Sequence, residues 1–478
     1  MFRIKAVQIP SLREAVLLTI TIIGIMFGSI VILEANPHIP LVIVLLLLFI
    51  YGLIKKVPYK ELENGITEGT KTGMAAVFLF FFIGILIASW MLGGTIPTLI
   101  YFGFNIVTPK FFLAIVFLVS AIVGISVGSS LTTVGTIGVA FIGISSATDV
   151  SLPMTAGAIV SGAFFGDKMS PLSDTTNMAS SILKVDLFAH IKNMTWTTIP
   201  AFLISFILFG FLSPDIGSAD FSKMEVFQQG LLDTGRVSWY SAIIPIVVLL
   251  YFSLKKAPAL LALAAGAISA IIISFFHGFI PLQGYLDVLF SGFTSNTGVE
   301  EVDELLTRGG IEDMFFTITL VLLALSLGGL LFTLGIVPKL LSTIEKALKK
   351  VGSVVFASAL TAIGINFLIG EQYLSVLLTG EAYSAQYKKV GLHNINLARV
   401  SEDAGTVVNP LVPWSVCGVF ITSVLDVSTM AYVPFTFFCL LSPILTIIYG
   451  FTGKTLTYIE VDETLSEKSI LQDAKTDQ

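Results

Sequence analysis

Charged side chains are scarce in this chain. Only 12% of its 478 residues are Asp, Glu, Lys or Arg, whereas soluble domains carry about 25%. Hydrophobic residues make up 55% of the sequence, and the mean hydropathy is +0.92. These values exclude an ordinary soluble domain and predict an all-α polytopic membrane protein embedded in lipid. The net charge of -6 arises largely from loops and the tail and so gives no information about a nucleic-acid partner; none is expected for a protein of this class.

Cysteine and histidine are also rare. Cys417 and Cys439 both lie in apolar runs, which excludes a disulfide framework and predicts two buried free thiols. The four histidines are too far apart in sequence to give a metal-ligand spacing, and no resident cofactor is expected. We interpret Asp186 and His190, together with the acidic residues of 300–313, as solvated loop charges.

We expect no cleavable signal peptide, because the first apolar run, 15–33, is a full-length span without a small-residue cleavage site. Further runs suited to crossing a bilayer lie at about 41–54, 74–92, 194–213, 240–254, 258–276, 315–336 and 432–450. Two regions differ, at about 111–148 and 353–386. Each joins two apolar pieces through a small, polar centre, which predicts a helical hairpin that is either re-entrant or fully spanning.

Two polar sequences interrupt apolar segments at membrane depth, at about 153–178 and 400–424. Backbone broken by proline is tolerated there only where it is buried in protein or lines a cavity. Each segment is therefore predicted to be a broken helix. Such a pair in two corresponding halves is the best sequence pointer to the binding site of a transporter.

The halves resemble each other at a lag near 240. The motif 90–97 matches 331–338, Gly128 and Gly138 match Gly370 and Gly380, and Ser170-Pro-Leu matches Asn409-Pro-Leu. Lys and Arg clusters collect in alternate loops, and cytoplasmic loops carry such residues. This bias places both termini in the cytoplasm and gives the two repeats opposite topology, as in secondary transporters.

The predicted organisation follows from these observations. The segments are N-terminal spans (1–60), repeat 1 (61–192), connecting spans (193–290), repeat 2 (291–425), a last span (426–453) and a polar cytoplasmic tail (454–478). Each repeat supplies one hairpin and one broken helix, and the two halves are expected to meet at a central site.

The first broken segment is rich in oxygen ligands. Asp167 and Asp174 are two helical turns apart, and Pro171 disrupts the helix between them. Hard cations prefer oxygen ligands, and a carboxylate can hold a cation or a proton, so Na⁺ and H⁺ would compete for it. A helix cap at Ser173 or Asp174 is the structural alternative. The candidate ligands are Asp167, Ser170, Asp174, Thr175, Thr176 and Asn177.

The second segment carries Asp403, Thr406 and Asn409 as candidate ligands, and we expect Na⁺ at Asp167, Asp174, Asn177 and Asn409. An ion pair of Arg399 with Glu402 or Asp403 is the structural alternative. Lys168 is either a counter-ion or a snorkelling cation. In the second hairpin Glu371 has an apolar setting, which favours a functional role. Secondary candidates are Lys168, Arg399, Glu402, Ser129, Ser130, Thr132 and Thr133.

At these motifs the chain resembles the NhaC-type Na⁺/H⁺ antiporter family. The strings that carry the resemblance are 166–177 and 402–414, followed by Cys417-Gly418. The resemblance implies a bacterial inner-membrane antiporter with inverted repeats that exchanges Na⁺. It leaves the substrate open, because similar members include a malate/lactate antiporter that couples Na⁺ and H⁺.

The leading hypothesis is therefore Na⁺/H⁺ exchange by a secondary transporter that is not an enzyme. The alternative on the same fold is Na⁺- and H⁺-coupled exchange of an organic anion, held by Arg399, Lys168 and the polar groups of both motifs. An intramembrane aspartyl protease would need a second Tyr-Asp motif, which is absent. A channel would need a ring of identical residues. The sequence leaves a homodimer open.

Overall fold

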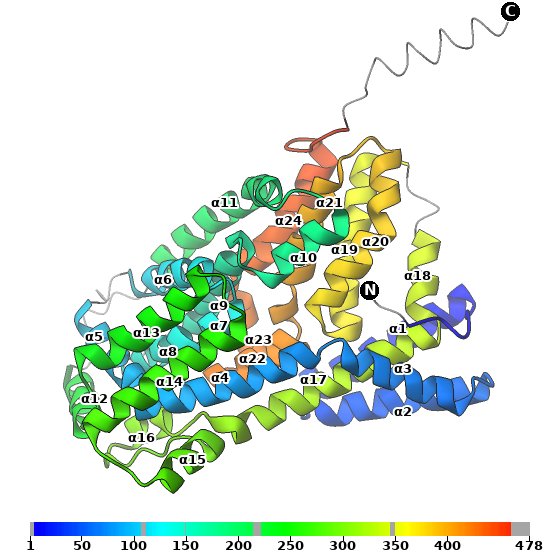
Figure 1. The fold of residues 1–478 in the computed structure, drawn as a ribbon. Coiled ribbons are helices and arrows are strands. Elements are labelled where there is room, and N and C mark those ends of the chain that lie inside the picture. The colour runs from blue at the N-terminus through cyan, green and yellow to red at the C-terminus, as the bar shows by residue number, and fades with distance from the viewer. Residues whose placement is uncertain (1–3, 107–110, 149, 214–220, 345–348, 460–478) are drawn as a thin grey trace, which may run out of the picture.

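The computed structural model describes residues 4–106, 111–148, 150–213, 221–344 and 349–459. These residues form helices, and their only β-type pairings are two isolated bridges. Seven helices in the described ranges are long and apolar enough to cross a membrane, or nine if each of two bent pairs counts as one span. The predicted all-α polytopic membrane fold is thereby confirmed (Figure 1).

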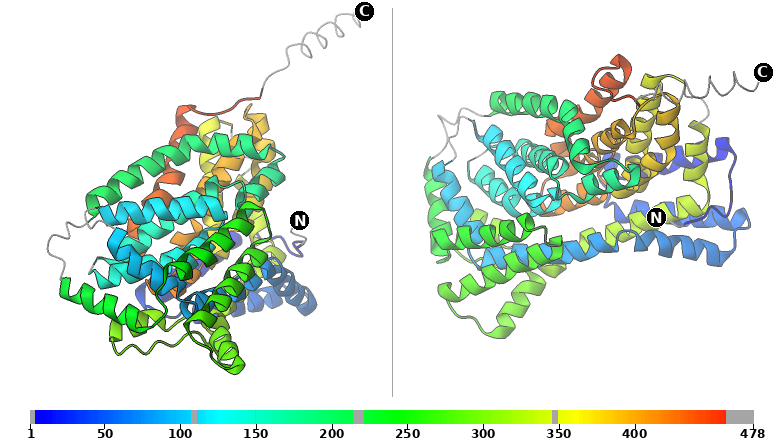
Figure 2. Two further views of the ribbon diagram at one scale, coloured as in Figure 1. Left: turned by 60° about the vertical axis from the view of Figure 1, so that its left-hand side comes forward. Right: turned by 45° about the horizontal axis from the view of Figure 1, so that its top comes forward.

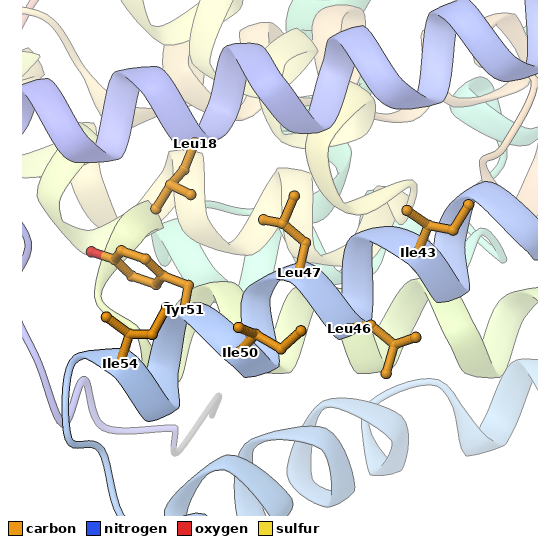
Figure 3. A pocket seen from close by; sticks show the side chains of 7 residues that line it. All are labelled: Leu18, Ile43, Leu46, Leu47, Ile50, Tyr51 and Ile54. Atoms are coloured by element: carbon orange, nitrogen blue, oxygen red, sulfur yellow. The ribbon is translucent and has the colours of Figure 1, made fainter.

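A peripheral group of helices lies at one end of the molecule, beside α18 (Ile336–Ile344) (Figure 1). It consists of α1 (Leu12–Phe27, continued by a π-helical turn), α2 (His38–Ile54) and α3 (Tyr59–Lys71). Ser11 and Glu14 start α1 with a capping box. Between α1 and α2 runs an apolar groove of about 560 Å³, lined by Leu18 and one face of α2 (Figure 3). Such a groove suits lipid chains, because six of its seven lining side chains are aliphatic and the seventh is Tyr51.

The first half then runs through a series of helices that includes the predicted hairpin and broken helix. They are α4 (Met74–Leu92), α5 (Thr95–Ile106), α6 (Phe112–Val127), α7 (Ser130–Thr133), α8 (Val139–Ala147), α9 (Leu152–Met169), α10 (Asp174–Leu183) and α11 (Leu187–Leu212). A π-helical turn, Val134–Gly138, joins α7 to α8. The first hairpin is thus α6 with α7–α8, and the broken helix is α9–α10.

Connecting helices gather at the end of the molecule opposite to α1–α3 (Figures 1 and 2). They are α12 (Phe221–Asp233), α13 (Trp239–Leu254), α14 (Ala259–His277), α15 (Leu282–Ser291) and α16 (Glu300–Leu306). The acidic residues Glu300, Glu301, Asp303 and Glu304, predicted to be solvated loop charges, lie in α16, and one of them fastens the loop before this helix. Asp303 accepts hydrogen bonds from the Ser295 hydroxyl (2.7 Å), the Thr297 amide (2.7 Å) and the Gly298 amide (3.0 Å).

The second half repeats the order of the first. It contains α17 (Gly310–Thr333), α18, α19 (Val351–Ile369), α20 (Gln372–Lys389), α21 (Asn394–Ser401), a π-helical turn (Glu402–Thr406), a 3₁₀ turn (Asn409–Leu411), α22 (Val416–Leu425), α23 (Thr429–Tyr432), a 3₁₀ turn (Val433–Phe435) and α24 (Phe437–Thr452). The second hairpin is α19–α20. The second broken helix bends by 44° between residues 411 and 416.

Helix starts in the two halves share one spacing. Both α7 and α20 begin directly after a capping residue, at Ser130 and Gln372, which are 242 residues apart. The starts of α9 and α21, of α10 and α22, and of α11 and α23 have the same spacing. This register pairs Pro171 with Pro413, so the Ser170-Pro-Leu match to Asn409-Pro-Leu predicted from sequence is wrong by one helical turn.

The C-terminal residues that follow α24 pack against the protein. We call residues 454–459 the C-terminal strap. Its backbone pairs with the turn between α20 and α21, where the His393 amide donates to Thr457 O (3.0 Å) and the Ile459 amide donates to Gly391 O (2.8 Å). The predicted polar tail is therefore folded at its start, and residues 460–478 lie outside the described ranges.

Candidate functional site

A cavity of about 880 Å³ lies between the two hairpin tips and the first broken helix. Each tip has the same local design. Gly128 and Gly370 end α6 and α19 with φ values of 71° and 76°, and the following residue, Ser129 or Glu371, caps the next helix. Left-handed backbone favours glycine, which explains why a small centre marks both hairpins in the sequence.

Asp167 projects from the last turn of α9 to the wall of this cavity. The turn packs tightly on α6, since a Cβ at Gly166 would lie 2.5 Å from the Ala121 carbonyl oxygen. Asp167 is 5% exposed. Its Oδ2 accepts hydrogen bonds from the Ser130 amide (3.2 Å) and hydroxyl (2.8 Å). The first hairpin thus presents the start of α7 to this carboxylate, as helix N-termini favour anions.

The break between α9 and α10 occurs around Pro171, as predicted. Ser173 caps α10, which confirms the structural alternative for that residue, and its hydroxyl accepts from the Thr176 amide (3.4 Å). Asp174 lines the cavity with an exposed side chain. Asn177 also lines it, but its amide group donates to the Pro171 and Ser173 carbonyls (2.9 and 2.7 Å) and so braces the break.

Several hydroxyl candidates are engaged with the backbone. Ser170 donates to Ile125 O (2.7 Å), Thr176 to Lys168 O (3.2 Å) and Thr133 to Ser129 O (2.9 Å). Thr132 lines the cavity, and its amide donates to the Ser129 hydroxyl (3.3 Å). Ser170, Thr176 and Thr133 therefore support the backbone around the site, whereas Thr132 lies at the cavity wall.

Glu371 lines the cavity from the opposite hairpin tip, with Gln372 and Tyr373 beside it. Its Oε2 accepts from the Leu374 amide (2.7 Å), so the side chain caps α20. The same carboxylate therefore has a structural role and a position at the cavity wall.

Asn409, predicted as an ion ligand, lies behind this wall. Its amide donates to Asn366 Oδ1 (2.8 Å), and its own oxygen accepts from the Cys417 amide (2.9 Å). Asn366 in turn donates to the Gly405 carbonyl (2.6 Å) in the π-helical turn. The structure thus gives Asn409 the role of bracing the second broken helix, and it is not among the cavity-lining residues. Thr406 is fully buried in the same turn.

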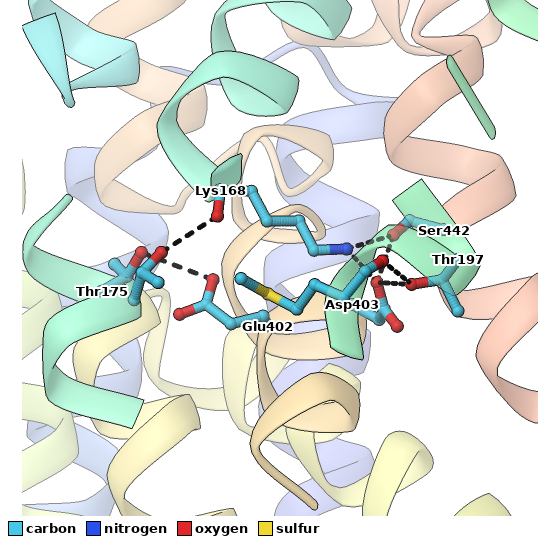
Figure 4. Close-up of polar contacts among 8 residues, drawn as sticks. Lys168, Thr175, Thr197, Glu402, Asp403 and Ser442 are labelled. Carbon is cyan, nitrogen blue, oxygen red and sulfur yellow. Dashed lines mark hydrogen bonds and ion pairs between the residues drawn. The ribbon is translucent and has the colours of Figure 1, made fainter. Parts of the chain in front are cut away.

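A buried ion pair joins the two broken helices directly. The Lys168 ammonium contacts Asp403, and both side chains are fully buried (Figure 4). Asp403 Oδ1 also accepts from the hydroxyls of Ser442 (2.6 Å) and Thr197 (3.1 Å). Lys168 is therefore a counter-ion. Neither Glu402 nor Asp403 forms the expected ion pair with Arg399 in the described structure, because Arg399 donates to Thr455 O (3.1 Å) of the C-terminal strap.

One contact connects this ion-pair cluster to the cavity. The Thr175 hydroxyl donates to Glu402 Oε2 (3.4 Å), and Thr175 lines the cavity (Figure 4). Glu402 is adjacent to Asp403 in the π-helical turn of the second broken helix. Its hydrogen bond with Thr175 therefore joins the second broken helix to the first.

Sequence reasoning missed several buried polar residues. Ser442 and Thr197 lie in predicted membrane spans and give no signal beyond a single hydroxyl. His190, interpreted as a solvated loop charge, is fully buried. Its spacing to Asn193 and Thr197, one helical face, was the available signal.

Together the cavity lining holds three carboxylates, Asp167, Asp174 and Glu371, against one cation, Lys256. Among the described residues no group of three or more His, Cys, Asp or Glu side chains could hold a metal ion. A cation bound here would instead use Asp167 together with hydroxyl and backbone oxygens, which suit a hard monovalent ion.

Comparison with known proteins gives consistent matches. The profile of the Na⁺/H⁺ antiporter family matches residues 162–454. The chain is 39% identical over 440 residues to "Na(+)/H(+) antiporter NhaC" of Alkalihalophilus pseudofirmus, covering 91% of this chain and 95% of the relative. It is 39% identical over 444 residues to the protein of the same name in Bacillus subtilis (92% and 98%). A "Malate-2H(+)/Na(+)-lactate antiporter" of B. subtilis is 34% identical over 466 residues (97% and 99%).

Proposed function

The chain belongs to the Na⁺/H⁺ antiporter family, and from that premise we propose that it exchanges Na⁺ for H⁺ across the bacterial cytoplasmic membrane by alternating access. It is a multi-pass secondary transporter and not an enzyme. The main support for this function is the buried Asp167 carboxylate at the cavity wall, which accepts a hydrogen bond from Ser130. Such a carboxylate holds either a proton or a cation, so occupancy by one excludes the other.

The charge of the cavity supports a cation as the substrate. Lys168 and Arg399, which could have held an organic carboxylate, point elsewhere, because Lys168 is paired with Asp403 and Arg399 with the C-terminal strap. An organic dianion would meet Asp167, Asp174 and Glu371 with only Lys256 to offset them. Exchange of malate for lactate remains the second candidate, favoured by the relative that bears this name.

The cavity faces the side predicted to be cytoplasmic. Its lining includes Thr72 and Lys256, which adjoin the basic residues Lys71 and Lys255. Cytoplasmic loops collect such residues. We therefore infer an inward-open state for this structure, and the charge bias of the loops supports a cytoplasmic location of both termini.

Everted membrane vesicles with an internal pH dye test the function. We expect NaCl alone to dissipate a respiration-generated pH gradient when the protein is present, and vesicles without the protein to respond much less. A strict requirement for malate or lactate would favour the second candidate. No response to Na⁺ under either condition would contradict both.

A further inference from the structure

One face of α11 carries polar side chains from the C-terminal strap to the buried ion pair. His190, Asn193 and Thr197 are three and four residues apart and therefore share a helical face. Asn193 donates to the Thr457 hydroxyl (3.4 Å) at the strap, and Thr197 donates to Asp403 (3.1 Å). This face of α11 therefore extends from the C-terminal strap to Asp403, and neither of these lines the cavity.

A second polar face runs in parallel on the second broken helix. Asn396, Arg399 and Asp403 have the same spacing as the three residues of α11. The Asn396 amide donates to Thr457 O (2.6 Å) and its oxygen accepts from the Thr457 amide (3.0 Å). The strap therefore closes both polar faces at the same end, and Asp403 lies at the other end of both.

A third contribution comes from α24, where Ser442 and Thr446 are one turn apart. Ser442 bonds to Asp403 (2.6 Å), and Thr446 lies one turn closer to the strap, which follows this helix. Polar faces of α11, α21 and α24 therefore converge on one carboxylate.

Between the strap and Asp403, many buried polar atoms have no protein partner within the described ranges. They are both ring nitrogens of His190, Nε and Nη2 of Arg399, Asn193 Oδ1, Thr446 Oγ1 and Asp403 Oδ2. Buried polar groups are almost always hydrogen-bonded, to protein or to water. Several unpartnered polar atoms buried on the facing sides of three helices are the setting in which internal water is found.

We propose that these three faces line a hydrated proton route, separate from the cation cavity, that leads from the C-terminal strap to the ion pair of Lys168 and Asp403. Glu402 is the neighbour of Asp403 in the π-helical turn, and its contact with Thr175 links the route to the cavity wall. The proton moves by hopping: each water accepts one proton on its oxygen and donates another to the next, so one H⁺ is transferred and no other bond changes. This inference rests on the proposed Na⁺/H⁺ exchange.

The separation of the two routes follows from the lining. None of His190, Asn193, Arg399 or Thr446 is among the residues that line the cavity. Both routes end on the face predicted to be cytoplasmic, since the strap pairs with the turn that follows Lys388 and Lys389. Na⁺ would enter through the open cavity while H⁺ leaves beside the strap.

Comparison of two modes of exchange shows whether these polar side chains conduct protons or only stabilise the structure. In proteoliposomes, ²²Na⁺/Na⁺ exchange requires only the cavity, whereas Na⁺/H⁺ exchange also requires the proton route. The test variants are Thr446→Val, which removes one hydroxyl at nearly constant shape, and His190→Leu. Thr317→Val is the matched control, because Thr317 is also a fully buried hydroxyl without a partner among the described residues, but on α17.

We expect each test variant to slow Na⁺/H⁺ exchange by about tenfold and to leave ²²Na⁺/Na⁺ exchange at the wild-type rate, while Thr317→Val leaves both rates unchanged. Unchanged Na⁺/H⁺ exchange in Thr446→Val and His190→Leu would overturn the route, and so would a parallel loss of both modes. Wild-type protein that moves Na⁺ but no H⁺ would contradict the proposed function itself.

Discussion

At the scale of single residues, two consecutive side chains of the first broken helix have different functions: one lines the cavity and the other forms a buried ion pair. Asp167 faces the cavity and the first hairpin, whereas Lys168 reaches Asp403 on the second broken helix. Neighbouring residues of a helix point about 100° apart, so one turn can serve a binding site and a structural contact. The ion pair is fully buried, so loss of one partner leaves an unpaired buried charge and lowers the free energy of unfolding.

Removal of one partner of this pair should be more harmful than removal of both. Lys168→Met leaves Asp403 buried without its counter-ion, which costs about 3–5 kcal/mol in comparable pairs. Lys168→Met combined with Asp403→Leu leaves no buried charge, so we expect its melting temperature in detergent to exceed that of the single variant.

Lys71→Met is the matched control, because Lys71 pairs with Glu68 at the surface. Exposed pairs contribute about 0–1 kcal/mol, so its melting temperature should stay close to the wild-type value. A double variant less stable than Lys168→Met would show that the pair is not the main source of the effect.

At the scale of elements, the hairpin tips depend on glycine. Gly128 has a φ of 71°, and a Cβ there would lie 2.6 Å from Leu172 Cβ in the broken helix. For Gly128→Ala we expect a loss of about 1–2 kcal/mol from backbone strain alone, and slower exchange because the tip and the break shift together. Thermal melting and transport of the same preparation measure both effects.

Gly364→Ala is the control for this substitution. Gly364 lies inside α19, and a Cβ there would meet nothing within 4 Å. Alanine in a helix interior is favoured by about 0.5–1 kcal/mol, so this variant should be as stable as the wild type or more so. Equal stability of Gly128→Ala and Gly364→Ala would refute the role given to the tip.

The loop before α16 depends on one carboxylate. Although desolvation acts in the opposite direction, hydrogen bonds from Thr297, Ser295 and Gly298 hold the pKa of Asp303 below its usual value of 3.8. Because the folded-state pKa is the lower one, the stabilisation is fully present above pH 4 or so and is lost as the pH falls through the folded-state value.

Asp303→Asn should therefore increase hydrogen exchange of the backbone amides of residues 295–299 at neutral pH. Asp287→Asn is the control, since Asp287 is bonded only to the Gln283 side chain (2.8 Å) among the interactions of the described chain. Equal protection of the loop in both variants would contradict this account.

Local sequence signals located the two hairpins and the two broken segments but not the side chains that contact them across the fold. The small, polar centres that contain Gly128 and Gly370 marked the hairpins, and Pro171 marked the first break, because glycine and proline act on their own backbone. The partner of Asp403 lies 235 residues away, so nothing near it in sequence could identify Lys168. Arg399 was the nearer cation, but the fold turns it toward the C-terminal strap. The ion-binding role of Asn409 was predicted from its motif, and its hydrogen bonds to Asn366 and Cys417 could be known only from the structure.

At the scale of the whole molecule, the inward-open state requires a cavity that is open to the cytoplasm. Met178 lines this cavity, whereas Leu46 lines the apolar groove between α1 and α2. In a background without Cys417 and Cys439, we expect a membrane-impermeant maleimide to label Met178→Cys in inside-out vesicles and not in right-side-out vesicles. Leu46→Cys should stay unlabelled in both, because thiolate chemistry needs water. Labelling of Met178→Cys from the outside alone would reverse the assigned orientation.

Exchange by this site requires that the Asp167 carboxylate bind the transported cation. We would measure equilibrium binding of ²²Na⁺ to purified wild-type protein and to Asp167→Asn, with Asp287→Asn as the matched control and thermal melting as the check on folding. We predict saturable Na⁺ binding that is abolished in folded Asp167→Asn and retained in Asp287→Asn. Wild-type Na⁺ affinity in Asp167→Asn would contradict the claim.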